Sequence, residues 1–320
     1  MSRRLDGGDK REEVPALPAP ERILRGVLAI FGPTASGKSA VAEALADRIP
    51  ARVISADSAQ LYRGLSILTN QSPAALVAIW DLGHEASVAE YGRLAHAEID
   101  TALAAGSTPV VVGGTGLYFR AALGELDLPP APPAGARARW EALYDERGGQ
   151  AAHTLLAERD PEAAAAVHPN DRRRVVRALE LADAGHSLRG DRLWTEEWRH
   201  PTLVVGLDVP VPELDRRIAE RTRAMFEAGV VEEARSALAG PLSSTAGKIL
   251  GLRGVAELPR EEAEIVLAAR TRQLAAYQRK WMRRIPGLVT VQADRSLDEV
   301  VDDVLALARG GQRVPAGREG

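Results

Sequence analysis

The chain contains no cysteine among its 320 residues. This absence excludes disulfide bonds, thiolate nucleophiles and cysteine-based metal centres, and it is compatible with a reducing compartment. The six histidines show neither the spacing of a zinc site nor a serine motif with which to pair, so they predict no metal centre and no hydrolytic triad. Any catalytic chemistry must therefore come from carboxylates, cations, hydroxyls and the backbone.

Long hydrophobic runs are also missing. No apolar stretch reaches the roughly 18 residues that a membrane helix needs, and residues 1–25 mix prolines with charges of both signs. We therefore expect no membrane segment and a cytoplasmic protein. Residues 1–25 and 310–320 are rich in Gly, Pro and charge, which predicts a flexible N-terminal extension and a flexible tail.

A strong excess of one charge sign is absent as well. The formal net charge is -3 and the pI is near 6.1, so any contact with nucleic acid must come from local basic patches. Two such patches stand out, and for each the alternative is a solvated helix face. The first patch consists of Arg172, Arg173, Arg174 and Arg177. The second lies where no Asp or Glu occurs between Glu264 and Asp294, and it consists of Arg270, Arg272, Arg279, Lys280, Arg283 and Arg284.

Short apolar runs separated by helical stretches dominate the rest of the chain. Runs at 27–31, 52–55, 109–112 and 203–206 are typical of buried parallel strands, and the run at 288–291 is expected to add a last strand. A helix is expected over 39–48 and another over 87–105, where Ser87 and Glu90 have the spacing of a capping box. The alternation predicts an α/β fold, a P-loop-type parallel sheet flanked by helices.

The domain boundaries follow changes in composition. Residues 26–122 are expected to form the first part of the α/β core, and residues 201–309 to complete it with basic C-terminal helices. Between them, prolines at 129–133 mark a break before Ala- and Arg-rich helical sequence. We therefore expect a helical insertion domain over 123–200.

A phosphate-binding motif is the strongest single signal. Residues 32–39 match G-x-x-x-x-G-K-[ST] between an expected strand and an expected helix, the context that this motif requires; a chance match in a Gly-rich turn is the alternative. Backbone amides, the helix N-terminus, a lysine and a hydroxyl that can bind Mg²⁺ would together hold a di- or triphosphate. The expected diphosphate-binding residues are Gly32, Pro33, Thr34, Ala35, Ser36, Gly37, Lys38 and Ser39, with Ser39 as the metal ligand.

Five further segments, in order, resemble the tRNA dimethylallyltransferases, also called isopentenyltransferases. They are Ser55-Ala56-Asp57-Ser58-Ala59-Gln60-Leu61-Tyr62-Arg63-Gly64, Gly113-Gly114-Thr115-Gly116-Leu117-Tyr118, residues 168–180, residues 206–226 and residues 271–281. The chain departs from the usual family pattern at Ile67 to Pro73, at Gly251 to Gly254 and at Ala276-Tyr277-Gln278. These departures touch expected RNA contacts more than the chemical centre.

The resemblance implies transfer of a dimethylallyl group from dimethylallyl diphosphate to N6 of an adenosine in tRNA, at position 37 beside the anticodon, with release of diphosphate. It implies a monomer whose partners are tRNA and dimethylallyl diphosphate, with Mg²⁺ as cofactor. The expected catalytic residues are Asp57 as general base, Lys38 and Arg221 facing the diphosphate, and Thr115. The expected tRNA-binding residues are Asp57, Ser58, Ala59, Gln60, Thr115, Arg173, Arg174, Arg177, Lys248, Arg253, Gln278, Arg279, Lys280 and Trp281.

Other interpretations remain open from the sequence alone. Asp57 could bind Mg²⁺ through water or cap a turn, Thr115 could belong to a simple turn, and Arg221 could snorkel or pair with an internal acid. Tyr277 and Trp281, four residues apart, are more typical of core than of base stacking. For the whole chain the alternatives are a P-loop kinase or NTPase that binds ATP, a prenyltransferase acting on a free adenine nucleotide, and a non-catalytic RNA-binding protein.

Overall fold

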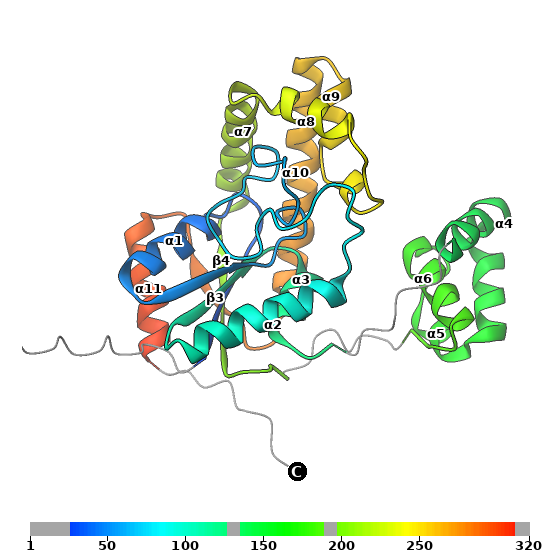
Figure 1. The fold of residues 1–320 in the computed structure, drawn as a ribbon, viewed down its shortest axis with the longest axis horizontal. Coiled ribbons are helices and arrows are strands. Elements are labelled where there is room, and N and C mark those ends of the chain that lie inside the picture. The colour runs from blue at the N-terminus through cyan, green and yellow to red at the C-terminus, as the bar shows by residue number, and fades with distance from the viewer. Residues whose placement is uncertain (1–25, 127–134, 189–196, 311–320) are drawn as a thin grey trace, which may run out of the picture.

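A single parallel sheet organises the protein. The computed structural model describes residues 26–126, 135–188 and 197–310, so the expected extension over 1–25, the prolines at 129–133 and most of the expected tail lie outside the described residues. Five parallel strands lie in the order β2-β3-β1-β4-β5 (Figure 1). The strands are β1 (Val27–Phe31), β2 (Ala51–Ser55), β3 (Thr108–Gly113), β4 (Thr202–Asp208) and β5 (Val289–Gln292). The expected α/β fold class is confirmed.

The central strands are apolar throughout because both faces of the sheet are covered. Leu28 of β1 pairs with Val110 of β3 and with Leu203 of β4, and all residues of β1 are buried. Such strands show a continuous apolar run instead of alternation, since neither set of side chains meets water. This explains why short apolar runs were sufficient to locate the strands.

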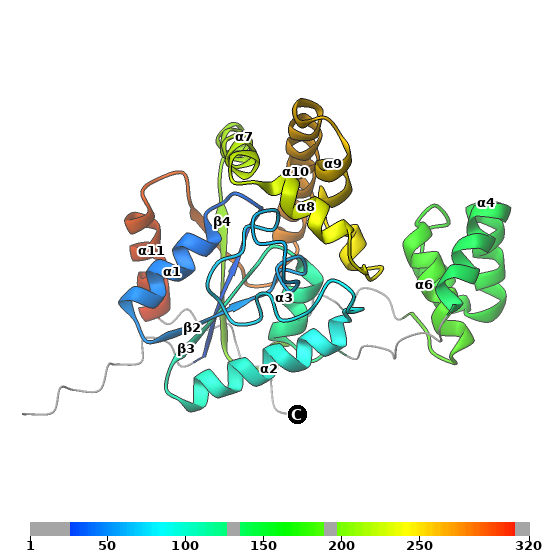
Figure 2. The ribbon, with the colours of Figure 1, turned by 45° about the horizontal axis from the view of Figure 1, so that its top comes forward.

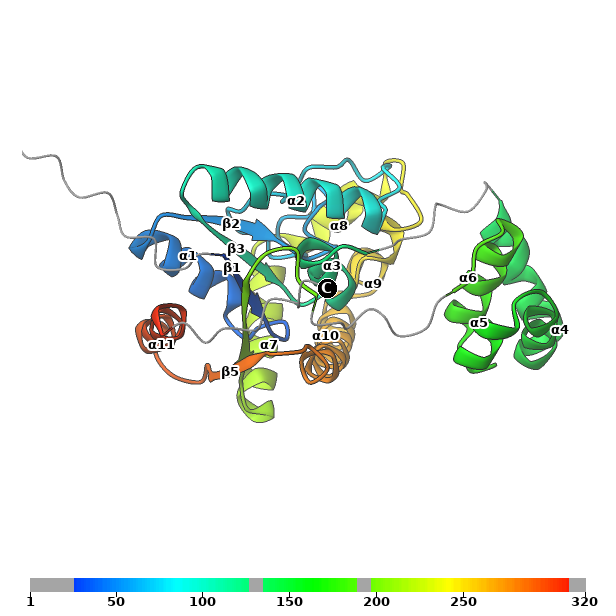
Figure 3. The same cartoon turned by 90° about the horizontal axis from the view of Figure 1, so that it is seen from below.

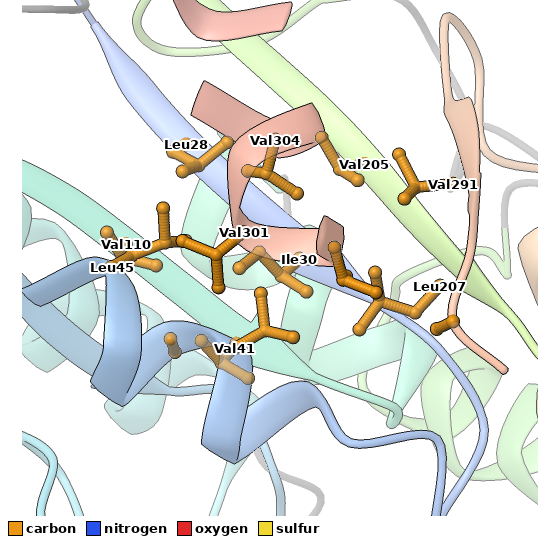
Figure 4. Packing of buried hydrophobic residues seen from close by; sticks show 14 of the residues in the cluster. Leu28, Ile30, Val41, Leu45, Val110, Val205, Leu207, Val291, Val301 and Val304 are labelled. Carbon is orange, nitrogen blue, oxygen red and sulfur yellow. The ribbon is translucent and has the colours of Figure 1, made fainter. Parts of the chain in front are cut away.

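One face of the sheet packs against α1 (Lys38–Arg48) and α11 (Leu297–Arg309). Figure 4 shows Val41 and Leu45 of α1 and Val301 and Val304 of α11 converging on Ile30 and its neighbours. The opposite face packs against α2 (Val88–Ala104) and α3 (Gly116–Leu123), as Figure 3 shows from below. The sheet is therefore the middle layer of three.

The start of α2 only partly matches the expected capping box. Ser87 is its N-cap, and the Ser87 Oγ accepts a hydrogen bond from the Glu90 backbone N–H at 3.1 Å. The Glu90 carboxylate, however, lies 2.9 Å from His84 Nε2 instead of returning to the cap. A histidine one turn before the helix competes for this carboxylate, which the local spacing could not indicate.

Four helices between β4 and β5 form a further apolar cluster. They are α7 (Val211–Glu227), α8 (Val230–Leu238), α9 (Leu252–Glu257) and α10 (Arg260–Met282). The short 3₁₀ helix η1 (Ala246–Lys248) lies between α8 and α9 in sequence, and its Ala246 is buried in the cluster on the α2 face of the sheet. Leu65 and Leu68, which follow β2 in sequence, are buried in the cluster of the four helices with Phe226 and Leu267. The long connection between β2 and α2 is thus anchored on helices from the far end of the chain.

Three helices form a unit within the region expected to be an insertion. They are α4 (Ala136–Arg159), α5 (Pro161–Ala166) and α6 (Arg172–Asp183), and they share an apolar cluster of their own that includes Trp140 and Leu179. Figure 2 shows this unit apart from the sheet. Among the residues that the structure describes, no helix combines the length and the apolarity that a bilayer crossing requires.

Arg120 of α3 connects the sheet domain to the segment that returns from the three-helix unit. Its side chain is 2% exposed, its Nη1 donates to the Glu197 carbonyl at 2.8 Å, and its guanidinium lies 4.8 Å from the ring centroid of Trp198. The Arg199 backbone N–H also donates to the Leu123 carbonyl at 2.9 Å. Residues 197–199 therefore lie against the sheet domain, not within the three-helix unit.

We predict that Arg120→Ala lowers the free energy of unfolding by about 2–4 kcal/mol, because it removes a buried side chain together with its hydrogen bond to Glu197 and leaves a cavity beneath Trp198. Chemical denaturation measures this loss. Arg93→Ala, on the exposed side of α2, is the matched control and should change the free energy by less than about 0.5 kcal/mol. Equal effects of the two substitutions would contradict the anchoring role of Arg120.

Candidate functional site

The phosphate loop connects β1 to α1 and has the shape that anion binding requires. Gly37 has φ 93°, a conformation that favours glycine, and directly precedes Lys38 at the start of α1. A Cβ on Gly32 would lie 2.8 Å from Ser36 Oγ, so this position is also confined to glycine. Ala35 adopts φ 64°, which is uncommon for a residue with a side chain. The backbone thus turns back on itself in front of a helix N-terminus.

Lys38 points back into the loop. Its Nζ donates to the Pro33 carbonyl at 2.7 Å. Burial lowers the pKa of Lys38 to about 8; the Asp57 carboxylate partly offsets this effect, and the positive charge of Arg221 adds to it. The lysine therefore loses its charge at an unusually low pH unless an anion enters the site.

A second cation reaches the loop from α7. Leu214, Ile218 and Met225 form the buried face of this helix, and Arg221 lies on the same side, as their spacing predicts. The Arg221 Nη2 donates to Thr34 Oγ1 at 2.6 Å. Burial lowers the pKa of the Arg221 guanidinium, with Asp57 acting in the opposite direction.

Gln278 of α10 holds the loop from the other side. Its Oε1 accepts a hydrogen bond from the Thr34 backbone N–H at 2.7 Å, and its side chain is 3% exposed. A Cβ on Gly114 would lie 2.4 Å from Gln278 Nε2, so the amide is packed between the phosphate loop and the turn after β3. The expected RNA contact is therefore, in this structure, an internal support of the phosphate loop.

Asp57 follows β2 and begins a tight turn. Its Oδ1 accepts a hydrogen bond from the Ala59 backbone N–H at 3.0 Å, so one carboxylate oxygen caps this turn. Gln60 extends the same wall of the site. Its Oε1 accepts from Ser55 Oγ at 2.8 Å, and its Nε2 donates to the Asn70 carbonyl at 2.9 Å.

A cavity of about 360 Å³ brings these groups together. Lys38, Arg217 and Arg221 supply positive charge, and Asp57 is the one carboxylate among the lining residues. Apart from the amides of Gln60, Asn70 and Gln278, the other lining side chains are small or apolar, which suits an anionic group that carries a short hydrocarbon chain. The lining residues are Thr34, Ala35, Gly37, Lys38, Ser39, Ala40, Val53, Ser55, Asp57, Gln60, Thr69, Asn70, Ser72, Ala74, Val112, Gly113, Arg217, Arg221, Leu274 and Gln278.

Several expected site residues lie outside this cavity. Thr115 is the N-cap of α3, two residues beyond the lining residue Gly113, and makes no side-chain cap. Ser58 and Ala59 lie in the half-buried turn after Asp57. Three other expected tRNA contacts lie on α6 of the three-helix unit, apart from the sheet, and they are Arg173, Arg174 and Arg177. The remaining ones lie on η1, α9 and α10, and they are Lys248, Arg253, Arg279, Lys280 and Trp281.

The two basic patches differ in how far their charges are already paired. In the first, Arg172 contacts Asp145 at 2.7 Å, and Arg177 contacts the fully buried carboxylate of Glu180 at 3.1 Å. In the second, Arg279 contacts Asp208 at 3.2 Å. The other cations at the end of α10 are exposed and form no ion pair within the described residues; they are Lys280, Arg283 and Arg284.

The Trp281 side chain is half-buried and packs against α3. A Cβ on Gly116 would lie 2.6 Å from Trp281 Cε3, so the indole packs directly on the first residue of α3. This agrees with the core interpretation of Trp281. Tyr277, its neighbour one turn earlier, is 55% exposed and does not fit that interpretation.

The arrangement of carboxylates disfavours the kinase or NTPase alternative. Asp208, at the end of β4, is the acid that such an enzyme would use for its metal, but it pairs with Arg279. Among the described residues, no three His, Cys, Asp or Glu side chains gather where they could hold a metal ion. A divalent cation would therefore depend on Ser39 and on the oxygens of a bound phosphate.

Several lining residues were not predicted as site residues. Arg217 lies in the segment 206–226 that resembles the family and one turn before Arg221, so both the resemblance and the spacing were available signals. Its Nε donates to Glu213 Oε1 at 2.7 Å, and its Nη2 to the Ala293 carbonyl at 3.1 Å.

The lining residues between 69 and 74 carry no motif. They reach the site because Glu233 of α8 accepts hydrogen bonds from the backbone N–H groups of residues 67 and 68 at 2.8 Å. The other lining residues without a predicted role are Ala40, Val53, Ser55, Val112, Gly113 and Leu274.

Comparisons with known proteins agree on one family. The IPP transferase model matches residues 60–285, and the isopentenyl transferase model matches residues 25–75. The tRNA dimethylallyltransferase of Thermobifida fusca (strain YX) is 43% identical over 301 residues, which are 88% of this chain and 93% of that relative. The tRNA dimethylallyltransferase of Streptomyces coelicolor is 43% identical over 288 residues, which are 85% and 90% of the two chains.

A solved structure extends the similarity to the fold. The full-length tRNA isopentenylpyrophosphate transferase from Bacillus halodurans superposes with a TM-score of 0.65 at 31% identity, over 89% of this chain and 96% of that chain. The likeness therefore covers most of both chains.

We predict that the affinity for inorganic diphosphate falls as the pH rises through about 8, the pKa of Lys38 in the free protein. Below this pH the lysine is already charged; above it, binding must take up a proton, so Kd rises by up to about tenfold per pH unit. Lys38→Arg, whose side chain stays charged, is the matched control and corrects for titration of the diphosphate.

Calorimetry in two buffers with different ionisation enthalpies gives the Kd and the number of protons taken up. Wild-type protein should take up protons above pH 8 beyond those taken up with Lys38→Arg. Identical pH curves and proton counts for the two proteins would rule out Lys38 as the titrating group.

Proposed function

The chain belongs to the IPP transferase family, whose curated relatives are tRNA dimethylallyltransferases, and from this premise we propose that it transfers a dimethylallyl group from dimethylallyl diphosphate to N6 of an adenosine in tRNA, releasing diphosphate. One observation carries the proposal: a single cavity is lined by most of the phosphate loop, by the cations Lys38, Arg217 and Arg221, and by one carboxylate, that of Asp57. We place the acceptor at position 37, beside the anticodon.

The cations and the loop act on the leaving group. When the bond between C1 of the dimethylallyl group and the diphosphate oxygen breaks, negative charge grows on the diphosphate while the allylic cation is delocalised. Lys38, Arg221 and the loop amides are fixed in advance around the place of that charge, so they stabilise the transition state without having to reorganise. Burial strengthens this effect, because the local dielectric constant is low.

Asp57 acts on the incoming amine. The N6 lone pair of adenine is drawn into the ring, so the amine becomes a better nucleophile when a base accepts its proton as the new C–N bond forms. The Asp57 Oδ1 is already used by the Ala59 backbone N–H, which leaves Oδ2 as the oxygen that receives the proton. The carboxylate also lies close enough to Lys38 and Arg221 to act on their pKa values, so base and leaving-group site are neighbours.

Mg²⁺ fits the residues present. Ser39 lines the cavity with a hydroxyl group, whereas a cage built only from protein carboxylates is lacking among the described residues. Mg²⁺ commonly binds through few protein oxygens together with substrate phosphates and water. When bound, it would neutralise part of the diphosphate charge, with Ser39 as its protein ligand.

The surroundings of the cavity suit a tRNA substrate. The unpaired cations at the end of α10 provide phosphate contacts, and the turn of Gly113 to Thr115 leaves little side-chain bulk where a base could approach. We further propose a monomer, as the family resemblance implies, and a cytoplasmic location, where its substrate tRNA is found.

We predict that the protein incorporates the label from radiolabelled dimethylallyl diphosphate into unmodified tRNA, and that nucleoside analysis finds it on N6 of adenosine. AMP in place of tRNA is the comparison that tests the free-nucleotide alternative. Label in AMP at an equal or higher rate would overturn the proposed acceptor. ATP hydrolysis without prenyl transfer would favour the NTPase alternative instead.

Asp57→Asn should lower single-turnover transfer by roughly 10² to 10⁴ while tRNA binding weakens little, because the amide keeps the size of the side chain but cannot accept the proton. The measurement is the transfer rate at saturating tRNA across a Mg²⁺ titration. If Asp57 mainly held the metal, affinity for dimethylallyl diphosphate would fall and added Mg²⁺ would restore much of the rate. Such a rescue would disprove the general-base role.

A further inference from the structure

Tyr277 is an exposed aromatic side chain in an unusual place. Of the described residues, five large hydrophobic side chains are exposed, and Tyr277, at 55%, is the aromatic one among them. It lies on α10 directly before Gln278, which supports the phosphate loop. An exposed phenol ring leaves apolar surface in water, and no packing need of the described core explains it.

The position of Tyr277 relative to the turn after β3 follows from its neighbours. Gln278 packs on Gly114 and Trp281 packs on Gly116, so one turn of α10 lies along residues 114–116. The Tyr277 ring meets the Trp281 ring edge to face, with centroids 5.8 Å apart and an interplanar angle of 75°. Tyr277 therefore lies outside the cavity, beside the turn that carries Thr115.

The Trp281 ring holds the tyrosine in place without covering it. An edge-to-face contact restricts the ring of Tyr277 while it leaves more than half of the residue open to solvent. A planar ring that is fixed in advance loses little conformational freedom when a second planar group stacks on it. This is the geometry of a stacking platform.

The charges around Tyr277 identify the partner. Lys280, Arg283 and Arg284 are exposed and follow it along α10 without ion-pair partners within the described ranges, and the chain has no acidic residue between Glu264 and Asp294. Free cations beside an exposed aromatic ring are the combination that binds an unpaired stretch of nucleic acid: phosphates meet the cations and a base stacks on the ring.

We infer that Tyr277 stacks against an unpaired base of the tRNA next to the acceptor adenosine and so positions the acceptor for entry into the cavity. This inference rests on the proposed function. The tyrosine ring is uncharged, so its stacking contact adds affinity for tRNA that does not depend on salt concentration. Lys280 and its neighbours add the part of the affinity that does depend on salt concentration.

Tyr277→Leu should raise the Kd for tRNA about 10- to 100-fold, the range expected when one stacked base loses its platform. Tyr277→Phe keeps the ring and should stay within about twofold of wild type. Ile265→Ala, at a 70% exposed position of the same helix three turns earlier, is the matched control and should change nothing. Affinity for dimethylallyl diphosphate alone should be unchanged in all three.

Salt dependence separates stacking from charge. The slope of log Kd against log salt concentration should be the same for Tyr277→Leu as for wild type, and it should become shallower for Lys280→Glu. A shallower slope for Tyr277→Leu, or a Tyr277→Phe variant as weak as Tyr277→Leu, would overturn the stacking role.

The base itself can be found with anticodon stem-loops in which each unpaired loop nucleotide is made abasic in turn. At one position next to the acceptor, removing the base should weaken binding by the wild-type protein as much as Tyr277→Leu does. Combining this abasic loop with Tyr277→Leu should raise the Kd no further than either change alone. Additive effects at every position would overturn the inference. An inactive wild-type protein would instead sink the proposed function, whatever Tyr277 does.

Discussion

Thr34 is held from two sides by helices that lie far from it in the sequence. Its backbone N–H donates to Gln278 at 2.7 Å, and its hydroxyl accepts from Arg221 at 2.6 Å. The first bond spans 244 residues of chain and the second spans 187. A phosphate loop that stood alone would have to be ordered by its ligand, whereas this loop is ordered when the chain folds. The site is thus prepared for an anion before any anion binds.

Preparing the site in this way has an electrostatic cost. Lys38 and Arg221 are buried near each other, and burial lowers the pKa of both, to about 8 for the lysine. Asp57 offsets part of the effect and is the only acidic side chain among the lining residues of the cavity. The same carboxylate that offsets the charge of the two cations is therefore the group proposed to accept the proton of the acceptor amine.

Helix α10 serves several purposes because its side chains point in different directions. Ala275 and Met282 pack in the core, Gln278 supports the phosphate loop, Trp281 packs on α3, and Tyr277 faces solvent. With about 3.6 residues per turn, residues only one to four positions apart reach separate surroundings. One turn of a helix can in this way connect the catalytic cavity with the surface proposed to bind RNA.

The strands, the parallel sheet and the phosphate loop can be predicted from the sequence, because each is encoded locally: both-face burial makes continuous apolar runs, and residues 32–39 carry their own turn and helix start. The position of Arg221 on the inner face of its helix can be predicted as well, since it follows from the spacing. The folded structure was needed to show that Gln278 supports the loop, that Arg217 and residues 69–74 line the cavity, and that Arg172 and Arg177 are paired. These facts depend on contacts between segments distant in the chain, and no local pattern records which segments will meet.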